Sequence, residues 1–159
     1  MSKIIYTNNI KLYLGDAYDA NNETFLKDKN INTIICVAED IKIVLKNSPN
    51  IIVYKYNLQD TYECNISQYF DEITDIIHKS DILLVNCVAG ISRSATFVIA
   101  YLMKYYKMNL KDAFLYVRKR RNQICPNKKF MTYLYEYEFK LFNQNSLTYE
   151  ECIQLFYYT

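Results

Sequence analysis

The feature that most constrains this 159-residue chain lies near its centre, where an apolar run leads through a short loop into a second apolar run. Residues 82–85 are all aliphatic, and residues 94–106 are apolar around almost the whole circumference of a helix. This order predicts a buried strand, a tight loop at its carboxyl end, and a buried central helix. Because both elements must share one core, the segment favours an α/β domain.

Flanking segments extend the same architecture. Short β-branched runs over residues 10–14, 31–37 and 51–56 are typical of strands. Apolar residues at helical spacing predict three amphipathic helices and a short last one, with starts expected at Asn65, Asn109, Pro126-Asn127 and the Thr148–Glu151 capping box. Strands alternate with helices first, and helices alone follow. The sequence therefore predicts an α/β fold with a central, largely parallel (mixed) sheet, helices on both faces and a helical C-terminal half.

Composition excludes several classes of protein. A single His excludes multi-His metal centres, and two Gly exclude a glycine-rich dinucleotide loop. The net charge of +2 is too mild to indicate nucleic acid as a partner, and no apolar stretch is long enough to span a membrane. Five Cys without Cys-x-x-Cys pairs, after an N-terminus without a signal peptide, indicate an intracellular protein. We expect it in the cytoplasm, with nuclear entry not excluded, and its oligomeric state is unknown from sequence.

The central loop carries the chemistry. Cys87 and Arg93 are separated by five residues, and Ser94 follows. A loop of this length that closes on a helix N-terminus turns its backbone N–H groups inward and forms an anion-binding nest, here from Val88, Ala89, Gly90, Ile91 and Ser92. Arg93 adds a planar fork for two phosphate oxygens, and the same positive environment favours the thiolate of Cys87. The plainer alternative is a buried Cys beside an Arg that forms a surface ion pair.

This loop and its flanks resemble the small, single-domain "atypical" dual-specificity protein phosphatases of the cysteine-dependent protein tyrosine phosphatase superfamily. The resemblance extends to other motifs, namely Leu12-Tyr13-Leu14-Gly15, Asn57-Leu58-Gln59-Asp60, Asp112-Ala113-Phe114, Val117-Arg118 and Pro126-Asn127. It implies a phosphotyrosine-phosphatase-like catalytic domain over residues 1–142. We expect residues 143–159 to form a C-terminal helical extension packed on the same domain.

The resemblance also implies a mechanism. Cys87 attacks phosphorus and forms a phosphocysteine, while Asp60 first protonates the leaving oxygen and then activates water. Arg93 and the loop N–H groups hold the phosphoryl oxygens, and Ser94 eases departure of the Cys87 sulfur. The implied substrates are phosphoproteins carrying phosphotyrosine, phosphoserine or phosphothreonine, and no metal or organic cofactor is implied. Other acidic residues have no comparable claim, including Asp16, Asp19, Asp40 and Asp71.

Two features modify this prediction. The family normally has His before the nucleophile, whereas this chain has Asn86, which can support the loop by hydrogen bonding but carries no positive charge. We therefore expect an active enzyme that turns over more slowly at acidic pH. The basic run 118–121 is a solvated face or, by resemblance, places Arg121 in a secondary anion site. Two alternatives stay open, namely a weakly active pseudophosphatase that binds phosphoproteins and an RNA 5′-triphosphatase of the same superfamily.

Overall fold

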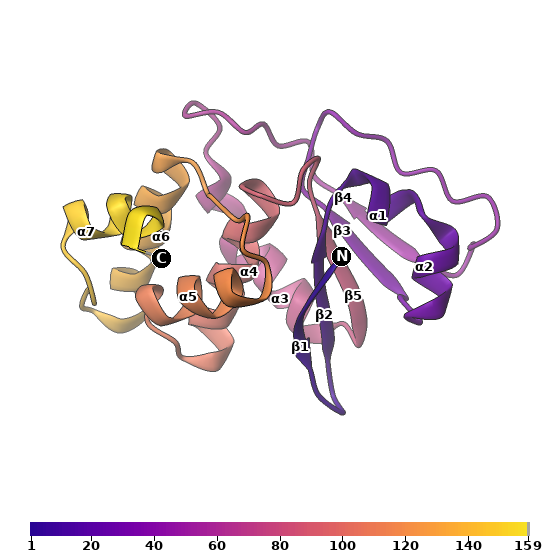
Figure 1. Cartoon of the computed structure of the whole chain (residues 1–159), viewed down its shortest axis with the longest axis horizontal. Helices are drawn as coiled ribbons and strands as arrows, with labels where there is room; N and C mark the ends of the chain where they lie inside the picture. The colour runs from indigo at the N-terminus through magenta and orange to yellow at the C-terminus, as the bar shows by residue number, and fades with distance from the viewer. Residues whose placement is uncertain (159) are drawn as a thin grey trace.

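The computed structural model describes residues 1–158, so Thr159, the last residue of the expected extension, lies outside the described part. A five-stranded sheet stands between two groups of helices (Figure 1). In chain order the elements are β1 (Ser2–Tyr6), β2 (Lys11–Gly15), α1 (Ala17–Asn21), α2 (Glu23–Asp28), β3 (Thr33–Cys36), β4 (Ile52–Lys55), the 3₁₀ helix η1 (Ile66–Tyr69), α3 (Phe70–Lys79), β5 (Ile82–Asn86), α4 (Arg93–Tyr106), α5 (Leu110–Arg120), α6 (Lys128–Phe142), α7 (Tyr149–Gln154) and η2 (Leu155–Tyr158).

The sheet confirms the predicted parallel core. Its strand order is β1-β2-β5-β3-β4, and β2, β5, β3 and β4 run parallel to one another. The register pairs Cys36 with Asn86, so β3 and β5 end side by side. The sequence did not predict β1, which pairs antiparallel with β2 at the edge and contains a register shift between Lys3 and Ile5. A parallel sheet gathers the loops that follow its strands at one edge, where sites in such folds are found.

Helices cover both faces of the sheet, as predicted. The larger core lies between the sheet and the α3–α6 group, and a smaller one lies on the face covered by α2 (Figure 1). The central helix α4 is buried along most of its length, which explains its nearly uniform apolar composition. Within the described residues no helix is both long and apolar enough to cross a bilayer. The sequence did not predict α1 and α2, because helices of five and six residues show too little periodicity.

Polar side chains fix the helix starts that the sequence predicted. Asn65, Asn109, Asn127 and Thr148 each accept a hydrogen bond from a backbone N–H of the first turn. The Thr148 N–H donates in return to the Glu151 carboxylate, which completes a capping box. These caps satisfy N–H groups that helix geometry leaves without partners, so each helix begins at a defined residue.

The segment after α6 packs on the same core. Leu147, Cys152 and Leu155 are buried against it. Glu138, on α6, is 1% exposed, and its carboxylate accepts bonds from the backbone N–H of Leu110 (2.6 Å) and from the N–H and hydroxyl of Ser146 (2.9 and 2.7 Å). This one carboxylate joins the start of α5, the middle of α6 and the turn that leads to α7.

Candidate active site

The predicted phosphate loop lies between Asn86, the last residue of β5, and Arg93, the first residue of α4. Neighbouring elements hold its backbone in place. The N–H of Ala17 donates to the carbonyl of Val88 (2.9 Å), and the N–H of Cys125 donates to the carbonyl of Ile91 (2.8 Å). The loop is therefore tied to α1 on one side and to the segment before α6 on the other.

Arg121 supports the loop from beneath. Its Nε donates to the carbonyl of Gly90 (2.8 Å), its Nη2 to that of Ala89 (3.3 Å) and its Nη1 to the hydroxyl of Ser2 (3.1 Å). The side chain is only 7% exposed. The expectation of a secondary anion site at Arg121 is therefore wrong, because its guanidinium is buried against loop carbonyls. Carbonyls that point toward Arg121 leave the N–H groups of the loop free to face the opposite side.

Gly90 occupies a position that only glycine fits. Its φ of +66° lies in the left-handed region. A Cβ atom there would lie 2.5 Å from Nη2 of Arg121 and 2.6 Å from the carbonyl oxygen of Gly15. Gly15 is the last residue of β2, and its carbonyl lies against Gly90. The two glycines of the chain are therefore neighbours at the loop.

The sulfur of Cys87 lies inside this loop. Cys87 is 2% exposed, and its Sγ accepts a hydrogen bond from the N–H of Gly90 (3.3 Å) and lies 3.1 Å from the hydroxyl of Ser94. The structure thus brings Cys87 and Ser94 together, as the sequence predicted. Asn86 is fully buried, and its Nδ2 donates to the carbonyl of Cys87 (3.2 Å). Asn86 therefore contacts the base of the loop with a neutral donor.

Arg93 is oriented by the loops that follow β3 and β4. Its Nη1 donates to Oδ1 of Asp40 (2.7 Å) and to the carbonyl of Leu58 (2.9 Å). Its Nε is buried and has no hydrogen-bond partner among the described residues. The hydrogen bond from Arg93 lowers the pKa of Asp40 below its ordinary value. One end of the guanidinium is thus held by protein, and its Nε remains available to a ligand.

Asp60 also reaches the loop. Its Oδ1 accepts hydrogen bonds from the hydroxyl of Ser92 (2.9 Å) and from Nδ2 of Asn127 (2.9 Å). The N–H of Asn127 donates in turn to the Ser92 hydroxyl (3.0 Å), and the Asn127 side-chain oxygen caps α6. Both donors bind the same carboxylate oxygen, Oδ1.

Sequence reasoning missed two contributors to this site. Asp40 was given no role, although it follows β3, whose carboxyl end adjoins that of β5. A carboxylate just past a neighbouring parallel strand is a signal that the sequence contained. Asn127 was predicted only to start a helix, and its second contact, with Asp60, had no local signal because 67 residues separate the two.

Comparisons with known proteins agree with the fold. The family model described as "Dual specificity phosphatase, catalytic domain" matches residues 12–140. Human dual specificity protein phosphatase 21 is 36% identical over 140 residues, covering 86% of this chain and 73% of that protein. Mouse dual specificity protein phosphatase 14 is 39% identical, covering 86% of this chain and 70% of that protein.

Solved structures give the same result. The human "tyrosine phosphatase-like serine/threonine/tyrosine-interacting protein" has a TM-score of 0.77 and 34% identity, covering 87% of this chain and 95% of that one. Human DUSP28 has a TM-score of 0.78, covering 91% of this chain and 100% of that one, and at 23% identity it bears on the fold alone. The chain therefore belongs to the dual-specificity phosphatase family. It is a cysteine-dependent protein phosphatase, which confirms the resemblance found in the sequence.

Proposed function

We propose that this chain removes phosphate from phosphotyrosine and from phosphoserine or phosphothreonine in proteins, through a phosphocysteine formed on Cys87. The observation that carries the proposal is the buried Nε of Arg93, which has no partner among the described residues. An unbonded donor inside a protein is costly, and a phosphate oxygen would satisfy it. Arg93 and Cys87 stand at the two ends of one five-residue loop, so the donor and the nucleophile can address one ligand.

In the first step the Cys87 thiolate attacks phosphorus, and the bond from phosphorus to the leaving oxygen breaks. Asp60 gives that oxygen a proton from Oδ2, while Ser92 and Asn127 hold Oδ1. Nε of Arg93 and the N–H groups of residues 88–92 hold the phosphoryl oxygens as charge moves onto them. The products are the dephosphorylated side chain and the phosphocysteine.

In the second step water attacks the phosphocysteine. Asp60, now ionised, accepts a proton from this water, and the sulfur–phosphorus bond breaks. The Ser94 hydroxyl lies 3.1 Å from Sγ and donates to the sulfur as it regains its negative charge. Inorganic phosphate leaves, and the thiolate is regenerated.

Asn86 gives specific support to the alternative of a weakly active, phosphoprotein-binding module. One structural relative is titled "phosphatase-like", which is a statement about that protein. The contacts of Cys87 with Ser94, of Arg93 with Asp40 and of Asp60 with Ser92 support turnover, because they gather the four proposed catalytic side chains at one loop. Asn86 donates to the Cys87 carbonyl but adds no charge, so we expect it to reduce the rate at acidic pH.

The location proposed from the sequence is the cytoplasm. All five cysteines are free in the structure, and Cys36, Cys87 and Cys152 are buried. Free thiols in a single compact domain are typical of a reducing compartment.

Hydrolysis of an aryl phosphate across pH tests the proposal. The wild type, Cys87→Ser, Asp60→Asn and Asn86→His are compared side by side, with phosphotyrosine and phosphothreonine peptides as second substrates. We expect Cys87→Ser to abolish turnover and Asn86→His to extend activity toward acidic pH. A wild-type rate no higher than that of Cys87→Ser would contradict the proposal and favour the binding module.

A further inference from the structure

The basic run at the end of α5 divides into two parts. Arg121 turns inward under the loop, whereas Lys119 and Arg120 stay exposed on the surface. The Arg120 guanidinium lies 3.5 Å from the centre of the Tyr116 ring, and its Nη1 donates to the Tyr116 carbonyl (3.1 Å). Arg120 is therefore held at a fixed place on the surface, with its charge directed at solvent.

A second group of cations lies on the β1–β2 hairpin. The ammonium groups of Lys3 and Lys11 are 4.9 and 4.8 Å from the centre of the Tyr6 ring, which is itself 59% exposed. Tyr6 and Lys11 are opposite each other in the β1–β2 register. The ammonium groups of Lys3 and Lys11 thus lie near each other at the Tyr6 ring. A bound anion would reduce the repulsion between these two positive charges.

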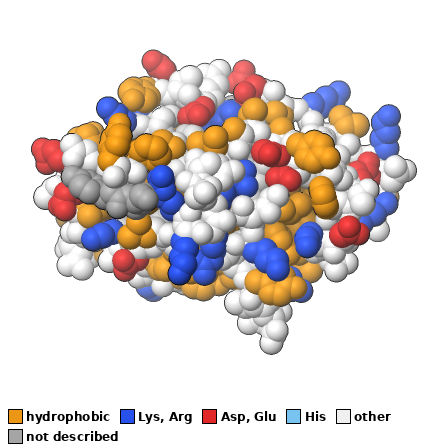
Figure 2. Space-filling view, viewed as in Figure 1, with side chains coloured by type: hydrophobic (Ala, Val, Ile, Leu, Met, Phe, Trp, Pro, Cys, Tyr) orange, Lys and Arg blue, Asp and Glu red, His pale blue; other side chains and the backbone are white. Residues whose placement is uncertain are grey.

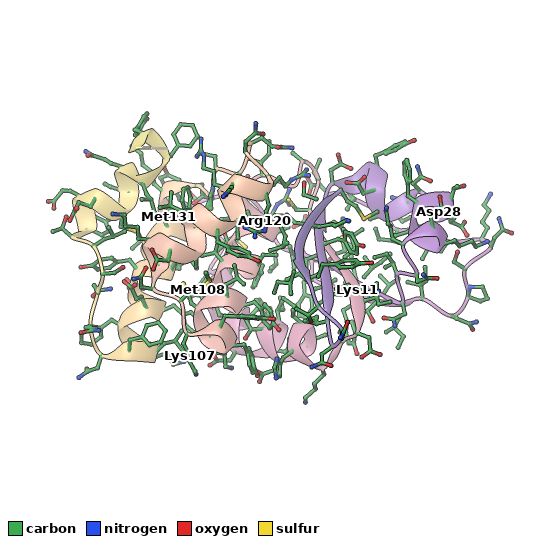
Figure 3. All side chains as sticks on the ribbon, turned by 60° about the horizontal axis from the view of Figure 1, so that its bottom comes forward. Lys11, Asp28, Lys107, Met108, Arg120 and Met131 are labelled. Carbon is green, nitrogen blue, oxygen red and sulfur yellow. The ribbon has the colours of Figure 1, made fainter. Side chains whose placement is uncertain are left out.

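The two groups lie on one continuous surface. The Tyr116 hydroxyl donates to the carbonyl of Ile4 (3.0 Å) and so joins α5 to β1. Figure 2 shows Lys and Arg side chains gathered over α5 and over the β1–β2 hairpin on the same face. In Figure 3, Arg120 lies at the end of α5 that faces the β1–β2 ribbon, and Lys11 lies on that ribbon. We call Lys3, Lys11, Lys119 and Arg120 the basic ridge.

Within residues 1–158 the basic ridge has no acidic partner. None of its four residues forms an ion pair with any described residue. Other cations are neutralised, since Lys104 and Lys140 pair with Asp71 and Arg93 pairs with Asp40. The ridge therefore concentrates positive charge on a chain whose net charge is only +2.

The basic ridge also begins next to the catalytic loop. Ser2 and Arg121 bond to each other, and Arg121 holds the Gly90 carbonyl. Lys3 and Arg120 are the sequence neighbours of this pair. Lys11 is opposite Ile82 at the start of β5, at the other end of that strand from the loop. An extended polypeptide with its phosphorylated residue over the loop would therefore meet Lys3 and Arg120 first and Lys11 last, at about 3.3 Å per residue.

We propose that the basic ridge binds an acidic segment of the phosphoprotein substrate, near the phosphorylated residue in its sequence. The inference rests on the proposed function, because it assigns the ridge to the same substrate. Carboxylates along an extended segment fit four dispersed cations, and the mild net charge of the chain disfavours nucleic acid as the occupant. The ridge would select among phosphoproteins without taking part in the chemistry.

The test uses phosphopeptides with one core sequence and either an acidic or a neutral extension, placed on the N-terminal or the C-terminal side. The ridge variants are Lys3→Gln with Lys11→Gln, and Lys119→Gln with Arg120→Gln. The matched control is Lys27→Gln with Lys29→Gln, which removes two exposed charges, one in the last turn of α2 and one just after it. Turnover of a small aryl phosphate is measured for every variant and is expected to stay unchanged.

For the wild type we expect kcat/KM about 10-fold higher with one acidic extension than with the neutral one, falling as salt rises. Each ridge variant should lose most of this preference, and the control should keep it. Absence of any preference, or a preference that both ridge variants retain, would overturn the proposal.

Two further measurements separate the possible failures. Binding of the acidic peptide to Cys87→Ser, measured by fluorescence anisotropy, reports on the ridge even if the wild type has no turnover. If the wild type does not hydrolyse the aryl phosphate, that result would instead count against the proposed function. A triphosphate-ended RNA that binds the ridge more tightly than the acidic peptide would overturn the polypeptide as occupant.

Discussion

Two buried ionic side chains in this molecule differ in one informative respect. Glu138, between α5 and α6, is 1% exposed, and both of its carboxylate oxygens accept hydrogen bonds. Arg93, at the start of α4, is 6% exposed, and its Nε has no partner among the described residues. Buried polar groups are normally bonded, so a satisfied group indicates a structural role and an unsatisfied one indicates a ligand.

The same contrast holds beyond these two residues. Three buried side-chain atoms have no partner within the described part of the chain, and they are Thr61 Oγ1, Asn86 Oδ1 and Arg93 Nε. Thr61 follows Asp60, the proposed general acid, Asn86 precedes Cys87, the proposed nucleophile, and Arg93 ends the proposed phosphate loop. The incomplete hydrogen bonding is therefore concentrated at the site, and no buried side-chain atom of residues 94–158 lacks a partner.

The largest effect expected from this comparison is that of Arg93→Ala. Removal of the guanidinium should lower kcat/KM for an aryl phosphate by on the order of 10³-fold, because several donors to the phosphoryl group are lost together. Resistance to urea should change little, since the substitution also removes an unsatisfied donor. Activity within tenfold of the wild type would show that Arg93 does not hold the phosphate.

Glu138→Ala should produce the opposite result. It leaves the backbone N–H groups of Leu110 and Ser146 without their acceptor, and we expect the free energy of unfolding in urea to fall by about 3 kcal/mol. Turnover measured well below the unfolding temperature should match the wild type, because Glu138 contacts no residue of the loop. If Glu138→Ala lowered kcat and left the free energy of unfolding unchanged, Glu138 would not have the purely structural role that distinguishes it from Arg93.

Asn127→Ala sharpens the comparison within the site. Because Asn127 acts through Asp60, its loss should slow hydrolysis by about 10-fold for poor leaving groups such as alkyl phosphates, which depend on the acid. Phosphates of acidic phenols should be affected much less. In an Asp60→Asn background the same substitution should have no further effect, and an additive loss would show that Asn127 acts by another route.

The smallest effect belongs to Asp71. The Tyr137 hydroxyl, with Lys140 and Lys104, lowers the pKa of Asp71 from 3.8 to about 2. A folded-state pKa below the unfolded one stabilises the fold above about pH 4, and this contribution is lost as the pH falls toward 2. The carboxylate is half exposed, so Asp71→Asn should cost less than about 1 kcal/mol at pH 7, measured by urea unfolding. An equal cost at pH 2 would rule out the ion pairs as its source.

The sequence predicted contacts between residues that are close together in the chain and missed contacts between residues that are far apart in it. The sequence could propose Cys87, Arg93 and Ser94 because they lie in one short segment, and Asp60 because a family motif surrounds it. The contact between Arg93 and Asp40 joins residues 53 apart, and that between Arg121 and Gly90 joins residues 31 apart. No local pattern encodes such pairs, so the role of Asp40 was missed and that of Arg121 was misassigned.

The sequence also failed to predict three short elements near the N-terminus, namely β1, α1 and α2. The helices α1 and α2 have five and six residues, too few for a helical period to appear. The edge strand β1 was also missed, although it is as long as β2. They nevertheless bear on the site, because Ser2 binds Arg121 and Ala17 binds Val88.

The central claim is that Nε of Arg93 is kept free for phosphate, and nuclear magnetic resonance of the arginine Nε–H groups in Cys87→Ser tests it most directly. On addition of inorganic phosphate, we predict that the Arg93 Nε–H signal moves downfield and exchanges more slowly with water. The backbone N–H of Leu110, already bonded to Glu138, should not move. Phosphate binding that leaves the Arg93 signal unchanged, or no binding at all, would contradict the account.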